Sequence, residues 1–491
     1  MKYTILLKQH IGAPDVPVVK QGDRVRCGSL LAVTAGLGAP IHSPADADVL
    51  EITDSYILLE GEPSDSYIPL EGTSDKELLA ASGIVGMGGA GFPTSVKCNT
   101  DLNGGYILVN AAECEPLLEH NIKQLETNAE KTIAGLKIVM KLCNAKEGIF
   151  AIKAKHKEAV DILDKLCQAE PSIRYHLLPD LYPMGEERAV VREVLGKLLP
   201  TTALPSEAGA VVINVETVLR VAECCLDKRP CITKNVSVAG KLNGGTYTRV
   251  FMDVPVGTTV GELIERAGGI DGEYGEIIMG GSFTGHAVTA DTPITKTTGG
   301  IIVTAPFENL NHAKLGLLLC ACGGNQARME DLAAKMNADV VLVQKCKQAV
   351  ENKGTLKCEN PGNCPGQAQK CLNFLKAGCT DILIGNCSDC TNTVMGSAPK
   401  LGLKVHHQTD HVFDTVGLER MRYLTKSKKV EAETETSAKA VSENTVSITD
   451  ESRSSENTSN ASFEFTQTLE DGILRIDIKE GKNIHIELPM Q

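Results

Sequence analysis

Short apolar runs that end in polar residues alternate with amphipathic stretches along the first half of the chain. The runs at Tyr106–Asn110, Ile149–Ile152 and Val211–Asn214 predict buried strands. Apolar residues recur at helical spacing from Ile122 to Met140 and predict a long helix between the first two strands. Strands and helices in this order indicate a layered α/β domain.

The first 75 residues carry short alternating runs rich in Val, Ile, Gly and Pro. Val18–Val25 and Ala39–Val49 resemble the two halves of a biotinyl/lipoyl-type barrel sandwich. A carrier domain of that type bears a modified lysine at the hairpin between the halves, whereas Ala32–Gly38 contains no lysine. We therefore predict a structural, non-carrier module.

Cysteines follow three predicted strands in the C-terminal half of the chain. The strands are Leu315–Leu319, Val340–Val343 and Ile382–Gly385, and helical stretches separate them. Such an alternation predicts a parallel sheet with right-handed crossovers, whose strands end at one common edge. That edge would bring together five cysteines, namely Cys320, Cys322, Cys346, Cys387 and Cys390.

Thiolates gathered at one edge suit an iron–sulfur cluster or zinc. A redox dithiol, formed by Cys387 and Cys390 or by Cys320 and Cys322, is the competing interpretation. Two loop cysteines are candidates for additional ligands or a second centre, while two others fit a buried core better. These are, respectively, Cys358 with Cys364 and Cys371 with Cys379. The histidines His406, His407 and His411 are candidate ligands, although packed or solvated roles are commoner for such residues.

The end of the chain changes composition. Residues 431–460 contain no aromatic residue, twelve Ser or Thr, and seven acidic against two basic residues, which predicts a disordered linker over 425–460. Residues 461–491 alternate with period two and predict a small β tail, with a poorly ordered segment as the alternative.

Composition narrows the class of protein. The 491 residues are 42% hydrophobic and carry a formal charge of −13, which argues against nucleic-acid binding. No apolar run approaches the length of a membrane helix, and no signal peptide is recognisable, so we expect a cytoplasmic protein without membrane insertion. In that compartment the 17 cysteines indicate metal binding or redox chemistry rather than disulfides. Association into a homo-oligomer is left open.

A glycine-rich loop is the strongest candidate for cofactor binding. Five glycines fall within the nine residues of Gly83–Gly91, and Phe92, Pro93 and Thr94 follow. Glycine allows the backbone to approach a ligand closely, and stacked N–H groups at a helix N-terminus favour a phosphate. Alone, such a loop is a weak signal.

Three further segments make the signal specific. Asn110–Pro116, Tyr182–Glu187 and Val211–Thr217 follow the loop in order. Together the four segments resemble the flavin-binding core of the NADH-oxidising, FMN-containing subunit of respiratory complex I. They resemble still more closely the C subunit of the Rnf electron-transport complex, from about Lys2 to Thr304. The hairpin pattern of 236–252 and the helix pattern of 260–267 resemble the β-grasp (SLBB-like) domain of the same families.

The resemblance implies a multidomain α/β fold. Its expected parts are a barrel sandwich (1–75), an FMN/NADH-binding α/β core (76–228), a β-grasp domain (229–305), a Cys-rich parallel α/β domain (306–424), a linker (425–460) and a β tail (461–491).

The resemblance also implies a site, residue by residue. FMN would be bound by Gly86, Gly88, Gly89, Lys97, Asn110, Glu113, Tyr182, Gly185, Glu186, Glu187, Asn214 and Thr217. Phe92 and Glu115 match the positions that contact NADH. Two departures weaken the nucleotide site: Ala112 replaces an acidic residue, and the second aromatic is missing near Cys98 and Asn99. Glu186 and Glu187 also suit the acidic first turn of a helix.

The cysteine region departs from the Rnf and complex I patterns because it lacks a ferredoxin-type run. It is similar, more loosely, to the [2Fe–2S] delta subunit of viologen-reducing hydrogenases. These features fit the soluble branch of the family that serves D-proline reductase. We therefore expect electrons to pass from NADH through FMN and an iron–sulfur cluster, of [2Fe–2S] type, to that protein acceptor. A flavin-dependent thiol–disulfide oxidoreductase and a non-catalytic assembly scaffold are the alternatives.

Overall fold

The computed structural model describes residues 1–245, 248–352, 354–420, 464–470, 473–479 and 484–489. The chain divides into two compact units, Met1–Ala432 and Glu433–Gln491. The larger unit combines parallel and antiparallel sheets with helices, as the expected mixed α/β class requires. Among the described residues, no helix has the length and apolar character needed to cross a membrane.

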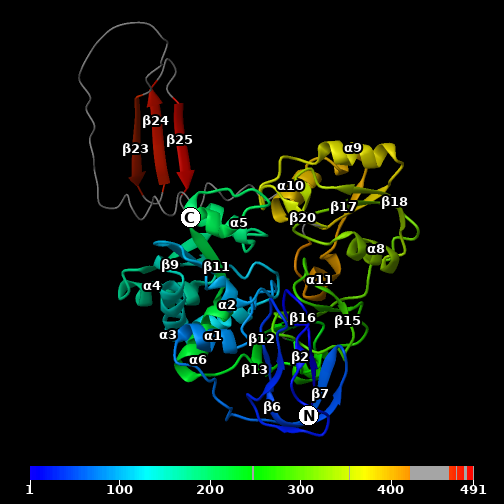
Figure 1. The fold of residues 1–491 in the computed structure, drawn as a ribbon. Coiled ribbons are helices and arrows are strands. Elements are labelled where there is room, and N and C mark those ends of the chain that lie inside the picture. The colour runs from blue at the N-terminus through cyan, green and yellow to red at the C-terminus, as the bar shows by residue number, and fades with distance from the viewer. Residues whose placement is uncertain (246–247, 353, 421–463, 471–472, 480–483, 490–491) are drawn as a thin grey trace, which may run out of the picture. The chain divides into compact units, whose positions relative to one another are not determined.

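The N-terminal strands form two antiparallel sheets, drawn in blue in Figure 1. Apolar side chains at alternate positions of β1 point inward, where Tyr3 and Ile5 pack on Ile57 and Leu59. The first sheet has the order β1 (Lys2–Leu6), β7 (Tyr56–Pro63), β6 (Ala45–Ile52), β3 (Arg24–Val25), and the second has the order β2 (Val16–Pro17), β4 (Leu30–Val33), β5 (Ile41–His42).

The next sheet is entirely parallel and carries two of the predicted flavin residues, Asn110 and Asn214, at the ends of its strands. Its order is β10 (Ile173–Leu178), β9 (Ala145–Lys153), β8 (Gly105–Ala111), β11 (Ala210–Asn214). The three predicted strands are confirmed as β8, β9 and β11, and the predicted long helix is confirmed as α3 (His120–Leu142). The sequence patterns did not identify β10, a strand with only two buried residues.

Helices cover both faces of this sheet, because alternate strand residues enter two different apolar cores. On one face Ile107 and Val109 pack with residues of α3 and α6, while on the other Leu108 and Ile149 pack with residues of α5. The helices are α1 (Asp75–Ala81), α2 (Thr94–Lys97), α4 (Lys157–Gln168), α5 (Glu187–Leu195), the 3-10 turn η1 (Pro205–Ala208) and α6 (Val215–Asp227).

A five-stranded mixed sheet follows. The predicted hairpin is present as the antiparallel pair β12 and β13, and the predicted helix is present as α7 (Val260–Arg266). The sheet order is β13 (Thr248–Pro255), β12 (Thr233–Gly240), β16 (Gly300–Val303), β14 (Ile277–Met279), β15 (His286–Val288).

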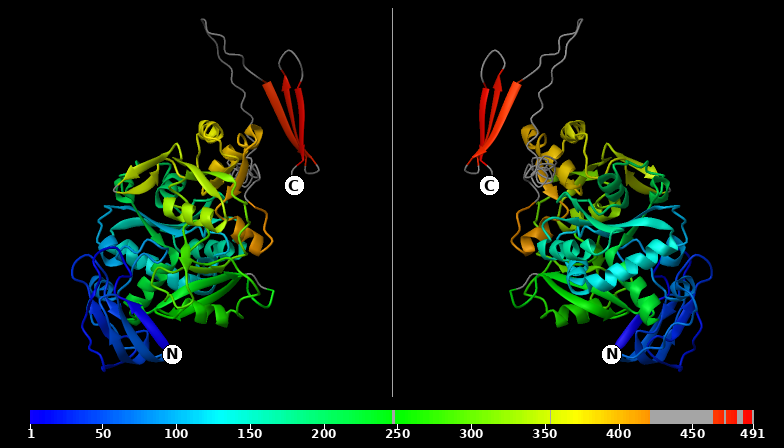
Figure 2. Two further views of the ribbon diagram at one scale, coloured as in Figure 1. Left: turned by 90° about the vertical axis from the view of Figure 1, so that its right-hand side faces the viewer. Right: turned by 90° about the vertical axis from the view of Figure 1, so that its left-hand side faces the viewer.

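The cysteine-bearing segment forms a four-stranded sheet whose strands are all parallel, seen in yellow and orange in Figure 2. Its order is β18 (Asp339–Lys345), β17 (Lys314–Leu319), β21 (Asp381–Ile384), β22 (Lys404–His407). A separate hairpin joins β19 (Ala349–Asn352) to β20 (Thr355–Cys358). The helices are α8 (Gln326–Lys335), α9 (Ala368–Lys376), α10 (Ser388–Met395), the 3-10 turn η2 (Pro399–Leu401) and α11 (Asp410–Thr415).

The second unit contains three antiparallel strands, β23 (Glu464–Glu470), β24 (Ile473–Lys479) and β25 (Ile484–Pro489). The predicted linker at 425–460 lies outside the described residues.

Candidate functional site

The glycine-rich loop is a closed turn with an exposed tip. Gly86 N–H donates to Phe92 O and Gly91 N–H donates to Gly86 O, both at 2.9 Å. Gly88 and Gly89 are exposed, and Gly89 has a φ of +99°, which favours glycine. The loop therefore presents bare backbone to solvent at its tip.

The N-terminus of α6 supports this loop. The side-chain oxygen of Asn214 caps the helix by accepting from Glu216 N at 2.9 Å and Thr217 N at 3.2 Å. The Thr217 hydroxyl accepts from Met87 N at 3.0 Å, and a Cβ at Gly88 would lie 3.0 Å from Asn214 Nδ2. The predicted phosphate-end residues thus lie directly beside the glycine-rich loop.

Asn110 connects the end of β8 to the segment that precedes α5. Its side-chain amide donates to Gly185 O at 2.9 Å, and its side-chain oxygen accepts from Ala112 N at 3.2 Å. A Cβ at Gly185 would lie 2.9 Å from Cys114 Sγ, so a larger residue here would displace the Cys114 side chain. Two predicted flavin segments, 75 residues apart in sequence, are therefore in contact.

Glu113 is a buried carboxylate with unusual electrostatics. Its backbone is left-handed, with φ +35°, and its side chain accepts from Asn121 N at 2.9 Å. Burial raises the pKa of this carboxyl to about 7, and the hydrogen bond from Asn121 only partly opposes the shift. The side-chain amide of Asn214 donates to Asn121 Oδ1 at 3.2 Å, which links Glu113 to the α6 N-terminus.

Glu186 begins a helix, as one interpretation of the sequence proposed. Its carboxylate accepts from Arg188 N at 2.9 Å and Ala189 N at 3.0 Å and so caps α5. The same carboxylate pairs with Arg188 Nε at 3.0 Å. Glu187 is the first residue of α5. Much of the hydrogen-bonding capacity of Glu186 is therefore used within the protein.

Glu115, one of the two predicted nucleotide contacts, is covered by the hairpin between β14 and β15. Its carboxylate accepts from Phe283 N at 2.9 Å, Thr284 Oγ1 at 2.7 Å and Ser282 Oγ at 3.4 Å. Burial raises the pKa of this carboxyl above its usual range, although these hydrogen bonds oppose the shift. Phe92, the other predicted contact, is half-buried.

Lys97 is held against the sheet by a hydrogen bond to its backbone. Its ammonium donates to Val212 O at 3.0 Å, and its side chain is half-buried. The structure thus places Asn110 against Gly185 and links Gly88 to Glu113 through Asn214 and Asn121. Lys97 and Glu115 have other protein partners.

The cysteines at the strand ends share one core. All 17 cysteines of the chain lie in described residues and none forms a disulfide. The five cysteines predicted to converge lie in a single cluster of buried side chains, to which Cys358 of β20 also belongs and against which Cys364 and Cys114 pack. We call seven of them the thiol group: Cys320, Cys322, Cys346, Cys358, Cys364, Cys387 and Cys390.

The thiols interact with one another and with side-chain amides. Hydrogen bonds to the thiols of Cys346 and Cys364 raise the pKa of Cys390, and a hydrogen bond from Cys390 is the main cause that lowers the pKa of Cys364 to about 6. The Gln367 amide donates to the Sγ atoms of Cys346 at 3.2 Å and Cys364 at 3.3 Å. The Asn386 amide donates to Cys390 Sγ at 3.0 Å. N–H donors of this kind stabilise negative charge on sulfur.

Arg188 places a buried cation beside the thiol group. Its Nη2 donates to Cys358 O at 2.7 Å, and Nη1 is buried without a hydrogen-bond partner. The charge of Arg188 contributes to lowering the pKa of Cys358, although a hydrogen bond from Cys322 is the largest cause. Among the described residues, no three His, Cys, Asp or Glu side chains surround one point as ligands of a single metal ion.

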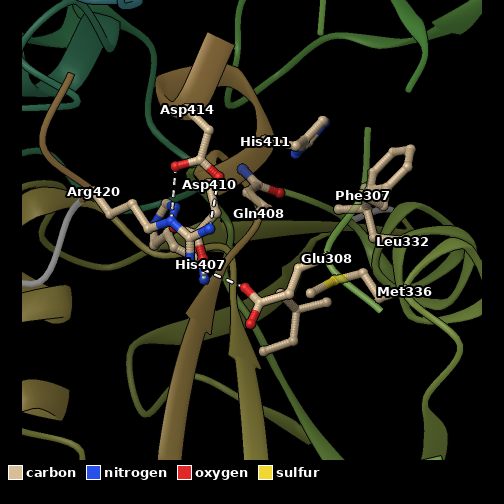
Figure 3. Close-up of a pocket in the computed structure, with 11 residues that line it drawn as sticks. Phe307, Glu308, Leu332, Met336, His407, Gln408, Asp410, His411, Asp414 and Arg420 are labelled. Carbon is tan, nitrogen blue, oxygen red and sulfur yellow. Dashed lines mark hydrogen bonds and ion pairs between the residues drawn. The ribbon is translucent and has the colours of Figure 1, made fainter. Parts of the chain in front are cut away.

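The three histidines have partners of their own. His406 Nε2 lies 2.8 Å from Asp381 Oδ1, His407 Nε2 donates to Asn386 O at 3.0 Å, and His411 Nε2 lies 2.9 Å from Glu276 Oε1. These contacts show packed histidines, the commoner role for such residues. His407 and His411 also line a cavity of about 10 Å³, beside which Arg420 pairs with Asp414 and Glu308 (Figure 3). That volume holds about one water molecule and excludes a flavin.

An aromatic pair connects the flavin segments to the thiol group. The rings of Tyr182 and Phe283 stack with centroids 3.8 Å apart and planes 11° apart. The Tyr182 hydroxyl donates to Cys322 O at 2.6 Å, and the edge of His407 meets Phe283 with centroids 5.4 Å apart. Sequence reasoning did not identify Phe283, Arg188 or Asn121, because no motif marks them. The only sequence signal near any of them is that Arg188 directly follows the predicted flavin residues Gly185, Glu186 and Glu187.

Two segments of this chain match known protein families. Residues 79–223 match the family model described as the Nuo51 FMN-binding domain, and residues 1–68 match the RnfC barrel sandwich hybrid domain. The glycine-rich loop, Asn110, Glu113, Gly185 and Asn214 all lie within the first match. Fold and site therefore define a protein with a flavin domain of the complex I type.

Several relatives extend the match beyond single domains. One of them is the C subunit of the proton-translocating ferredoxin:NAD(+) oxidoreductase complex of Clostridium ljungdahlii. The chain is 32% identical to this relative over 61% of its own length and covers 70% of the relative. The chain belongs to this RnfC family of electron-transfer oxidoreductase components.

Other relatives match a smaller share of the chain. Cobalamin reductase PduS of Citrobacter freundii is 34% identical over 55% of this chain and 56% of its own length, and PduS of Salmonella typhimurium is 37% identical over 46% and 49%. The chain thus spans about half the length of these cobalamin reductases. An NAD⁺-reducing [NiFe]-hydrogenase structure aligns over 47% of each chain with 22% identity and a TM-score of 0.40.

Proposed function

We propose that this protein passes electrons from NADH through FMN and a cysteine-bound iron–sulfur centre to a protein acceptor, D-proline reductase. One observation carries the proposal. The Tyr182 segment, which belongs to the flavin motif, touches the thiol group directly through the 2.6 Å hydrogen bond to Cys322 O. A cofactor held by the flavin segments and a centre at the thiols would therefore be neighbours within one compact unit.

The residues around the glycine-rich loop fit FMN. Bare backbone at Gly88 and Gly89, and the positive end of the dipole of the 13-residue helix α6, suit a phosphate group. Asn110 and Glu113 supply polar groups at the end of β8, where α/β sheets bind their ligands. When bound, FMN supplies the conversion between hydride transfer and single-electron transfer. The chain's own role is to hold the cofactor and to keep the carboxylates Glu113 and Glu115 beside it.

The thiol group fits a cluster with cysteine ligands. The donor atoms are sulfur, the site is buried, and amide N–H groups and the Arg188 guanidinium face the sulfurs or their loops. The predicted ligands Cys320, Cys322, Cys346, Cys387 and Cys390 exceed the four that one cluster uses, so the ligand set is a subset of the thiol group. A [2Fe–2S] cluster remains our proposal for its type.

D-proline reductase is proposed as the acceptor because of the composition of the cysteine segment. It has no ferredoxin-type run, which separates it from Rnf proteins with such runs, and it resembles the proline reductase-associated branch instead. We assign residues 229–305 to a β-grasp (SLBB-like) domain and residues 306–424 to the electron-transfer domain. Cytoplasmic location belongs to the same proposal.

Cofactor content tests the proposal. After anaerobic purification, we expect about one FMN per chain, released by acid and identified by chromatography, together with iron and acid-labile sulfide. Gly88→Val, which places a side chain against Asn214, should lose FMN and keep iron, while Gly36→Val, at an exposed turn with open space around it, should keep both. Wild-type protein without FMN would refute the flavin assignment. Metal-free protein that reduces disulfides with NADH would establish the thiol–disulfide alternative, which the low pKa of Cys364 favours.

A further inference from the structure

The hairpin between β14 and β15 reaches out of its sheet to the predicted nucleotide site. Its tip, Gly281–Thr284, lies between β14 and β15, and Gly285 N–H donates to Gly281 O at 2.8 Å to close the turn. A Cβ at Gly281 would lie 2.1 Å from the carboxyl carbon of Glu115, so this backbone packs directly on the carboxylate. We call residues 281–284 the hairpin tip.

The hairpin tip uses the hydrogen-bonding groups that a nucleotide would need. Glu115 accepts one backbone N–H and two hydroxyl groups from three consecutive residues, Ser282, Phe283 and Thr284. A nicotinamide nucleotide offers the same kinds of donors, the hydroxyls of ribose and the N–H of its carboxamide. A carboxylate has about four lone-pair sites, and the hairpin tip takes three of them.

The hairpin tip also covers an aromatic surface. The Phe283 ring stacks on Tyr182 at 3.8 Å with an interplanar angle of 11°, which is the contact that a flat heterocycle would make. Phe283 is 2% exposed, and its carbonyl accepts from Gln408 Nε2 at 2.9 Å. Thr284 is exposed, so the outer end of the hairpin tip lies at the surface. One segment therefore occupies both the carboxylate and the ring face.

We propose that the hairpin tip imitates a pyridine nucleotide and competes with it: Phe283 occupies the stacking position on Tyr182, and Thr284 and Ser282 occupy Glu115. Nucleotide binds only when the tip leaves. Departure also separates Phe283 from Tyr182 and from the 407–408 turn of the cysteine-bearing sheet. Nucleotide entry is thereby coupled to the contact between the flavin segments and the thiol group. This inference rests on the proposed NADH-linked function.

The competition predicts a gain of affinity when the tip is weakened. Thr284→Val removes the 2.7 Å hydroxyl donor to Glu115 without changing the shape of the side chain. Loss of this hydrogen bond to a charged group should shift the closed-to-open ratio by about tenfold or more. The apparent dissociation constant of a nucleotide should fall by a similar factor. Thr289→Val removes a hydroxyl from the turn directly after β15, away from Glu115, and serves as the matched control.

Calorimetric titration of FMN-loaded protein with tetrahydro-NADH, a redox-inert analogue, tests this directly. Tighter binding to Thr284→Val and to Phe283→Leu than to wild type and Thr289→Val supports competition. Equal or weaker binding to both variants, with measurable binding to wild type, overturns it and leaves the NADH-linked function standing. No binding to any form overturns the competition and the NADH-linked function together.

Hydrogen exchange gives a readout that does not depend on the variants. Added tetrahydro-NADH should speed amide exchange at the hairpin tip of wild-type protein, where Phe283 N–H is now bonded to Glu115. Slower exchange there would show that the tip closes over the nucleotide as a lid, which contradicts competition.

Discussion

Asn214 is predicted to serve two separable purposes, and substitution can divide them. Its side-chain oxygen caps α6, and its side-chain amide donates to Asn121 Oδ1 at 3.2 Å beside Gly88. Asn214→Ala removes both contacts. Asn214→Ser keeps a capping oxygen, since Asn and Ser are comparable caps, and removes only the amide.

The magnitudes follow from these contacts. Loss of the cap costs about 1 kcal/mol, which lowers the Tm of a domain of about 150–250 residues by about 2–4 °C. Asn214→Ala should show this shift in calorimetry, whereas Asn214→Ser should stay near the wild-type Tm. Both variants should bind FMN about tenfold more weakly, because each loses the hydrogen bond to Asn121, worth about 1.4 kcal/mol, that orients the Asn214 amide beside the glycine-rich loop.

Thr259→Ala is the matched control, because Thr259 caps α7 by accepting from Glu262 N at 3.2 Å, away from the predicted flavin residues. It should lower the Tm in the same way and leave FMN affinity unchanged, as measured by flavin fluorescence on titration of the deflavinated protein. Wild-type FMN affinity in Asn214→Ser, or equal loss of affinity in Thr259→Ala, would refute the role given to the Asn214 amide.

Three further outcomes are expected. Cys346→Ala should lower bound iron and sulfide on elemental analysis, whereas Cys379→Ala, buried outside the thiol group, should not; equal iron in both would contradict the ligand region. Because burial raises the pKa of Glu113 from 4.5 to about 7, native protein holds a proton that the unfolded chain releases, so stability falls as pH rises from about 4.5 to about 7. Glu113→Gln should flatten the Tm between pH 5 and 7, and an unchanged slope would refute this assignment. Arg188→Gln, which removes a buried cation, should make the midpoint potential of the cysteine-bound centre more negative in a redox titration, and an unchanged potential would contradict its electrostatic role.

Local pattern and topology explain what the sequence could predict. Strand β8 is a nearly continuous apolar run, so the sequence could predict that it ends near Asn110, where the flavin motif begins. The convergence of Cys320, Cys346 and Cys387 followed from parallel topology, because parallel strands end at one edge. Both inferences depend on rules that hold within one sheet.

Contacts between different sheets could not be predicted from the sequence in the same way. Glu115 and Phe283 are 168 residues apart and lie in loops next to strands of different sheets, and no periodicity links them. Glu186, predicted to bind the flavin, also caps α5, a role that depends only on the local backbone. Strand β10 escaped notice because an edge strand with two buried residues has little apolar pattern. Sequence reasoning therefore predicted most helices and strands but not the side-chain contacts that join distant segments.

An anaerobic titration of the purified protein with NADH, recorded as visible spectra, tests most directly whether the two sites form one electron-transfer path. Flavin absorbance should bleach first, and the bands of the cysteine-bound centre should then fade as electrons reach the thiol group. Protein that contains FMN but shows no spectral change with NADH, or a centre that stays oxidised beside reduced flavin, would contradict the path.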